Sequence, residues 1–200
     1  MGIAATTVQG NAHTIAGPSP QSEVGASLAT MTYDPRALAN YVLDTTAERG
    51  ASVTNMSLNK ILYFSHGWHL AVHDAPLISV AFEAWDYGPV LPLLYHQFKA
   101  FGDREIATRA TQIDLASGRN VKVGYRLVEK TRDHLDVMIE FYGPKSGPTL
   151  SHLSHDPAGP WATVRRSPNH PSMSIPDDLI KAYFGLKLRS RKGNVDGFQA

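Results

Sequence analysis

The stretch from Ser57 to His73 constrains the fold of this chain more than any other. Apolar and aromatic side chains repeat along it at helical spacing and cover nearly every side of the predicted helix. Such a helix is buried in the centre of a domain, because a surface helix needs one polar face. We therefore expect a mainly α, compact helical domain around a central buried helix at 57–73.

Helix start and stop signals predict further helices on both sides of this centre. Asp34 can cap a first helix, with Pro35 at its first position and Gly50 at its end. Another helix is expected to open in the sequence Tyr87-Gly88-Pro89-Val90, with Pro89 in the first turn, and to stop at Gly102.

The second half of the chain predicts one small β element among shorter helices. Two alternating runs flank 116–120, which is typical of a β-hairpin insertion. The segment 132–142 fits a strand and a helix, and Thr131 as a possible cap favours the helix. Short helices are expected near 149–155 and from Pro160, and a last one over 174–184 with Ser174 as its cap.

Both ends of the chain differ in composition from the segment between them. Residues 1–30 contain one charged residue, Glu23, and no aromatic residue, so they predict a disordered N-terminal tail. The sequence leaves open whether translation starts at Met1 or Met31. We expect the folded domain to span 31–185 and a basic, flexible C-terminal tail to follow at 186–200.

The overall composition narrows the class of protein. A 200-residue chain with 42% hydrophobic and 18% charged residues can bury one core, and a net charge of +1 creates no field of one sign. The absence of cysteine excludes disulfides, thiolate zinc sites and a cysteine nucleophile. No apolar run is long enough to span a membrane and no secretory signal is evident, so we expect a cytoplasmic location without membrane contact.

Three histidines of the central helix raise the possibility of a metal site. His66, His69 and His73 fall on one face at i, i+3 and i+7, which would allow a metal-dependent hydrolase. However, His69 lies within the apolar stripe and the other two at its edge. Gly67-Trp68 also stand where zinc-binding helices carry an acidic base. We therefore expect neither a metal nor another cofactor.

A second alternative is a DNA-binding autorepressor that uses Arg165, Arg166 and the basic tail. A cluster of cations after a last helix is more often a solvated terminus, and no recognition-helix pattern accompanies it. Nucleic acid is thus the less favoured partner. The sequence also lacks the glycine-rich and nucleophile motifs of common enzymes.

Four blocks together resemble a known family. They are LNKILYFSHGWHLA, PLISVAFEAWDYGPVLPLLYHQFKAFG, LSHLSHDPAGPWATVR and IPDDLIKAYF. In this order they resemble the Panacea domain, the SocA-like antitoxin family of bacteria, phages and prophages. The resemblance covers about 31–184, most of the chain.

The resemblance implies a helical binding module without catalytic activity. Members of the family act as antitoxins that bind a cognate protein toxin, usually encoded by the adjacent gene, and one route delivers the toxin to the ClpXP protease. It also implies a set of motif residues with structural or partner-binding roles. In this chain they are Trp85, Tyr87, Gly88, Pro89 and Val90 in the first block, and His155, Pro160 and Trp161 in the second. We interpret Gly88-Pro89 as a tight helix start and the two tryptophans as core or groove anchors.

Overall fold

The computed structural model describes residue 2 and residues 31–167 and 173–196. Apart from Gly2, the expected N-terminal tail at 1–30 lies outside the described residues. In the part that is described, helices dominate and strands are few and short, which confirms the mainly α fold. The helices are α1 (Pro35–Glu48), α2 (Asn55–His73), α3 (Pro92–Phe98), α4 (Glu129–Tyr142), α5 (Gly147–Ser154), α6 (Pro160–Arg166) and α7 (Asp177–Asp196).

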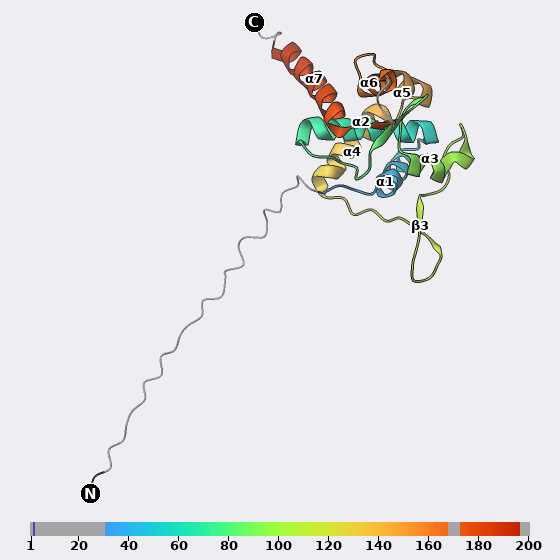
Figure 1. Cartoon of the computed structure of the whole chain (residues 1–200). Coiled ribbons are helices and arrows are strands. Elements are labelled where there is room, and N and C mark those ends of the chain that lie inside the picture. The colour runs from blue at the N-terminus through green and yellow to red at the C-terminus, as the bar shows by residue number, and fades with distance from the viewer. Residues whose placement is uncertain (1, 3–30, 168–172, 197–200) are drawn as a thin grey trace.

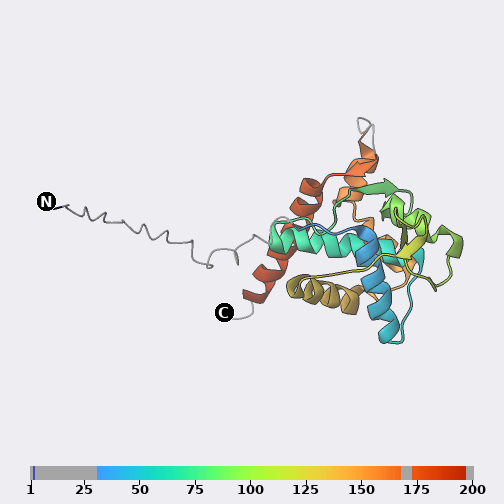
Figure 2. The same ribbon diagram turned by 90° about the horizontal axis from the view of Figure 1, so that it is seen from below.

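α2 is the central helix that the sequence predicts. It begins two residues earlier than expected, because Thr54 and Ser57 form a reciprocal capping box that satisfies the first amides. It ends at Asp74, which takes a left-handed conformation with φ 57°. Every residue from Ser57 to Leu70 is buried. Figure 2 shows α2 running through the middle of the molecule, with α1, α4 and α7 around it.

The predicted helix start at Gly88-Pro89 is wrong. Residues Phe82–Trp85 (β1) and Gly88–Val90 (β2) form an antiparallel hairpin, and Ser174–Ile175 (β5) pairs with the other side of β1. The strand order is β2-β1-β5. Pro89 is tolerated because β2 is an edge strand, where its missing N–H costs no ladder bond. The helix α3 begins at Pro92 instead, and the 3-10 turn Lys99–Phe101 follows it.

Other predicted helix boundaries also differ from the structure. Val128, not Thr131, precedes α4, and the buried Thr131 hydroxyl accepts a hydrogen bond from Tyr33 at 3.3 Å. Ser174 does not cap α7, because it pairs with Glu83 in the sheet. α7 itself continues to Asp196, through much of the segment for which we expected a flexible tail.

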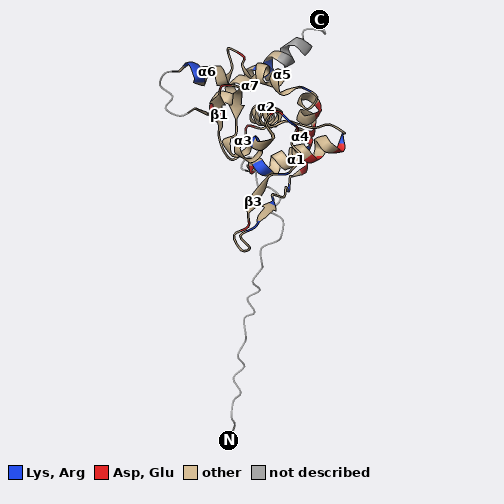
Figure 3. Ribbon diagram, turned by 90° about the vertical axis from the view of Figure 1, so that its right-hand side faces the viewer, with Lys and Arg blue, Asp and Glu red and all other residues tan. Residues whose placement is uncertain are grey.

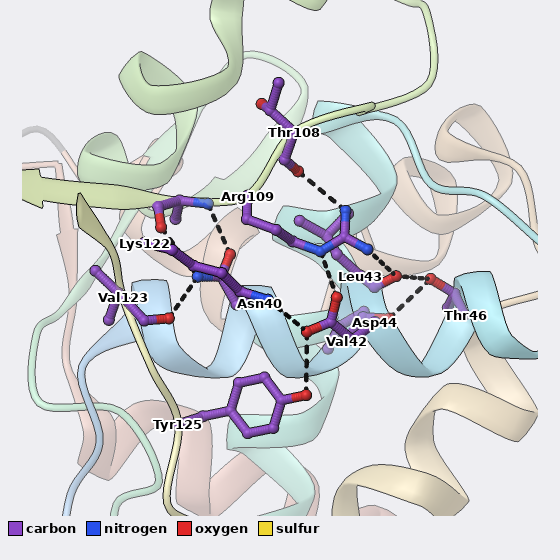
Figure 4. Close-up of polar contacts among 11 residues, drawn as sticks. Asn40, Val42, Leu43, Asp44, Thr46, Thr108, Arg109, Lys122, Val123 and Tyr125 are labelled. Carbon is purple, nitrogen blue, oxygen red and sulfur yellow. Dashed lines mark hydrogen bonds and ion pairs between the residues drawn. The ribbon is translucent and has the colours of Figure 1, made fainter. Parts of the chain in front are cut away.

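The predicted small β-hairpin is confirmed as β3 (Thr111–Ile113) and β4 (Asn120–Lys122), which protrudes from the helical body (Figure 1). The fully buried Asn40 of α1 anchors its base (Figure 4). The Asn40 amide nitrogen donates to the carbonyl oxygens of Ala110 and Val123 at 3.0 and 2.7 Å. Its oxygen accepts from the Ala110 N–H at 2.7 Å. One side chain thus satisfies backbone groups of both hairpin arms.

A second contact lies one helical turn further along α1. The carboxylate of Asp44 accepts hydrogen bonds from Arg109, Lys122 and Tyr125 (Figure 4). Asp44 is partly exposed, so water can replace some of these contacts when one partner is removed. We therefore expect the Asn40 contacts to contribute more to the free energy of unfolding than the Asp44 contacts.

We predict that Asn40→Ala lowers the free energy of unfolding by on the order of 2–4 kcal/mol, because it leaves buried backbone groups without partners. Asp44→Asn is the matched comparison and should cost about 1 kcal/mol or less. Urea denaturation of both variants measures the difference. Equal losses from the two variants would show that the buried amide is not the main anchor.

Candidate binding site

The hairpin β1–β2 is fixed to the helical body through its backbone carbonyls. Three alternate carbonyl groups along it each accept one hydrogen bond from a side chain of a different helix. These bonds are Trp161 Nε1 to Trp85 O at 2.7 Å, Ser151 Oγ to Tyr87 O at 2.9 Å, and Lys60 Nζ to Pro89 O at 2.9 Å. Since the donors come from α6, α5 and α2, the hairpin cannot shift relative to the core without breaking them.

A cavity of about 480 Å³ opens beside this hairpin. Its wall combines three aromatic rings and two methionines with five polar or charged side chains, a mixture that suits a ligand pocket. The residues that carry the argument below are Met56, Lys60, Trp85, Tyr87, Tyr95 and Met173. The cavity therefore combines an apolar lining with one buried cation.

The aromatic side chains at the cavity differ in exposure. Trp85 is partly buried, its ring lies 4.8 Å from the Tyr95 ring, and its Nε1 donates to Glu83 at 2.7 Å. Tyr87 lies in the turn of the hairpin and is 70% exposed. Tyr87 is thus a large exposed side chain on a firmly held backbone.

The structure brings the two motif blocks of the sequence together. His155 stacks against Trp161 with 3.9 Å between ring centroids, and Trp161 bonds to the Trp85 backbone. Pro160 is buried in the first turn of α6, and Val90 lines the cavity. Burial and the nearby Lys60 charge lower the pKa of His155, and its Nε2 is buried without a hydrogen-bond partner in the described structure.

Lys60 is the site residue that sequence reasoning missed. It is 1% exposed, and burial lowers its pKa to about 7. The available signal was a lysine inside a helix that is otherwise apolar on nearly all sides. A charged residue at such a position is rare unless it is paired or functional.

Gly88 is required for a reason other than the expected helix start. Its φ is 99°, a conformation that side chains with a Cβ rarely adopt. A Cβ at this position would also lie 2.8 Å from Lys60 Cε and in collision with the Ser154 hydroxyl. The glycine therefore permits the hairpin turn and also lets side chains of α2 and α5 lie close to the backbone of β2.

The three histidines of α2 do not form a metal site. His66 is fully buried, not at the edge of the stripe as expected, and both its ring nitrogens have protein partners. Nδ1 accepts from Ile78 N–H at 3.2 Å, so Nε2–H donates to Asp177 at 3.0 Å. Among the described residues, no group of three or more His, Cys, Asp and Glu side chains could hold a metal.

His69 has the environment of a neutral core histidine. Its Nδ1–H donates to the Ala75 carbonyl at 2.7 Å, and the His73 and His134 rings lie 4.6 and 5.2 Å from it. Burial lowers the pKa of His69 to about 4, so the ring carries no charge at neutral pH. Its role is therefore packing and hydrogen bonding within the core.

The basic residues considered for DNA binding are partly paired within the protein. Arg165 contacts Asp86 at 2.8 Å, and Lys187 contacts Asp156 at 2.9 Å. Figure 3 shows Lys and Arg on separate elements, among them the end of α6. This arrangement offers little support for the DNA-binding alternative. Within the described residues, no helix is both long and apolar enough to cross a membrane.

We predict that Gly88→Ala destabilises the fold by on the order of 3 kcal/mol or more, because backbone strain and the collision add. Gly50→Ala is the matched control: Gly50 also has a positive φ, 69°, but has open space around its Cβ position. It should cost about 1 kcal/mol. Chemical denaturation compares the two, and similar losses would contradict a role of Gly88 in close packing.

Comparisons with known proteins match the part of the chain that carries the two motif blocks. The family model described as "Antitoxin SocA-like, Panacea domain" matches residues 58–162, which include the hairpin and both blocks. The curated protein "Antitoxin SocA" of Caulobacter vibrioides is 34% identical over 154 residues, which cover 76% of this chain and 82% of that protein. No solved structure gives a significant match. The chain belongs to the SocA-like antitoxin family and contains its Panacea domain.

Proposed function

We propose that this chain neutralises a cognate protein toxin by binding it directly, through the face formed by the hairpin turn and the adjacent cavity. The observation that carries the proposal is Tyr87, a 70% exposed aromatic side chain on a backbone bonded to the core. Exposed tyrosines on rigid supports are typical centres of protein interfaces. Tyr95 of α3, 37% exposed, lines the same cavity as Tyr87 and adds to the exposed aromatic area.

The fixed backbone is suited to binding a partner. A preorganised surface loses little conformational entropy when a partner binds, so more of the contact energy contributes to affinity. The membership in an antitoxin family supports a toxin as the partner. We expect no catalytic activity, a cytoplasmic site of action and a toxin encoded by the adjacent gene.

We predict that Tyr87→Ser weakens toxin binding at least about tenfold, as loss of a central interface aromatic does, without changing the melting temperature. Phe141→Ser on α4 is the matched control, because Phe141 is also an exposed aromatic, at 50%, but lies away from the hairpin and its cavity. Binding is measured by titration against the purified product of the adjacent gene.

Three results would count against this face or this function. If Phe141→Ser weakens binding and Tyr87→Ser does not, the toxin binds at α4. If both variants bind normally, neither face contributes. If the unmodified chain shows no binding at micromolar concentration, direct neutralisation fails.

Delivery to the ClpXP protease is the finer part of the proposal. It rests on the family resemblance, and the long α7 next to the toxin-binding body offers a separate surface for a second partner. In cells without ClpXP, an adaptor loses its protective effect and toxin accumulates. Protection that persists with abundant toxin would show that binding alone is sufficient.

A further inference from the structure

Lys60 is a buried cation that no acidic side chain of the described structure balances. Its ammonium donates one hydrogen bond, to the Pro89 carbonyl, and it takes part in none of the ion pairs among the described residues. An ammonium has three N–H donors, so two remain for another acceptor. Because an unpaired buried charge is costly, an anion placed beside it would be strongly favoured.

Several other polar groups in the wall of the cavity have protein partners. The contacts are Asn55 to the Tyr95 carbonyl at 3.1 Å, the Leu91 N–H to Asn59 at 2.9 Å, and Arg165 to Asp86 at 2.8 Å. Arg165 keeps further N–H donors, but it is partly exposed and paired with Asp86, so Lys60 is the buried, unpaired cation of the described cavity wall. A ligand with one negative charge would match it.

The rest of the wall indicates what carries that charge. Trp85, Tyr95, Met56 and Met173 present aromatic and thioether surface around the cavity. Its volume of about 480 Å³ suits a small molecule or one or two residues of a peptide. Phosphate groups are usually held by several cations or by bidentate arginine, whereas Lys60 is the one buried cation of the described wall, and the partly exposed Arg165 is paired with Asp86. These features favour a carboxylate over a phosphate.

We propose that this cavity is a carboxylate-binding site, in which Lys60 pairs with a carboxylate attached to an apolar or aromatic body. The site lies in the cavity that borders the proposed toxin-binding face, and carboxylate binding does not require the toxin. Burial lowers the pKa of Lys60 to about 7, since no counter-charge offsets its desolvation. A bound carboxylate would supply that counter-charge and raise the pKa again.

The test uses the full chain and two probes of the same shape, 3-phenylpropionate and its neutral analogue 3-phenylpropanamide. Isothermal titration should show binding of the acid and at least about tenfold weaker binding of the amide, because only the acid supplies a negative charge that pairs with the ammonium. Equal affinities, or no binding of the acid at millimolar concentration, would overturn the proposal. This comparison needs no variant.

Substitution then assigns the effect to one lysine. Lys60→Met keeps a side chain of similar length and should remove the preference for the acid. Lys122→Met is the control, because Lys122 lies on β4, outside the lining of the cavity, and should leave both affinities unchanged. Acid binding that survives Lys60→Met in a folded variant would refute the role of Lys60.

A third comparison separates the two sources of such a carboxylate. The tripeptide Gly-Gly-Phe is titrated as free acid and as C-terminal amide. Tighter binding of the peptide acid than of 3-phenylpropionate would support the chain terminus of a partner protein as the ligand. Tighter binding of 3-phenylpropionate would support a free small acid.

Discussion

The burial of α2 on all sides is the constraint on which the rest of the fold depends. A helix with apolar surface all round needs neighbours in every direction, and α1, α3, α4, α5 and α7 supply them. At Gly67 the absence of a Cβ lets the Phe184 ring of α7 lie directly against the α2 backbone. The buried His66 adds a polar contact to Asp177 at the start of α7. α2 thus determines where the last helix packs.

The same helix also connects the core to the candidate site. Lys60 extends from α2 to the Pro89 carbonyl of β2, so one side chain links the central helix to the edge strand. Replacing it with an apolar residue would remove a costly buried charge but would leave that carbonyl without its donor. A buried ionisable group with a strongly lowered pKa is more often found at functional positions than in an ordinary core.

Local signals in the sequence were sufficient to predict some helices and strands and not others. α1, α2 and the β3–β4 hairpin follow from caps, apolar spacing and turn residues that lie within or next to each element. The sheet around β1 does not, because Phe82 pairs with Ile175, far along the chain. Gly88-Pro89 satisfies the rules for a helix start and those for an edge strand, and only the distant partner decides between them.

The candidate site was predictable as a set of residues but not as a geometry. The resemblance identified Trp85, Tyr87 and Trp161, yet their relation depends on which backbone carbonyls α5 and α6 reach. Sequence reasoning missed Lys60 because this residue is notable only for its burial in the folded protein. Helical spacing alone does not predict that a charged residue is buried.

The way in which the hairpin is held limits how the proposed binding face can change. Each of its three anchoring hydrogen bonds ends on a backbone carbonyl, at Trp85, Tyr87 and Pro89. A substitution of the exposed Tyr87 side chain therefore leaves its own anchor intact, because the carbonyl is present in every residue. Substitution of a donor such as Ser151 or Trp161 instead frees the backbone. The exposed side chain at position 87 can thus change while the hairpin keeps its position, whereas the donor side chains on the helices behind it hold that position.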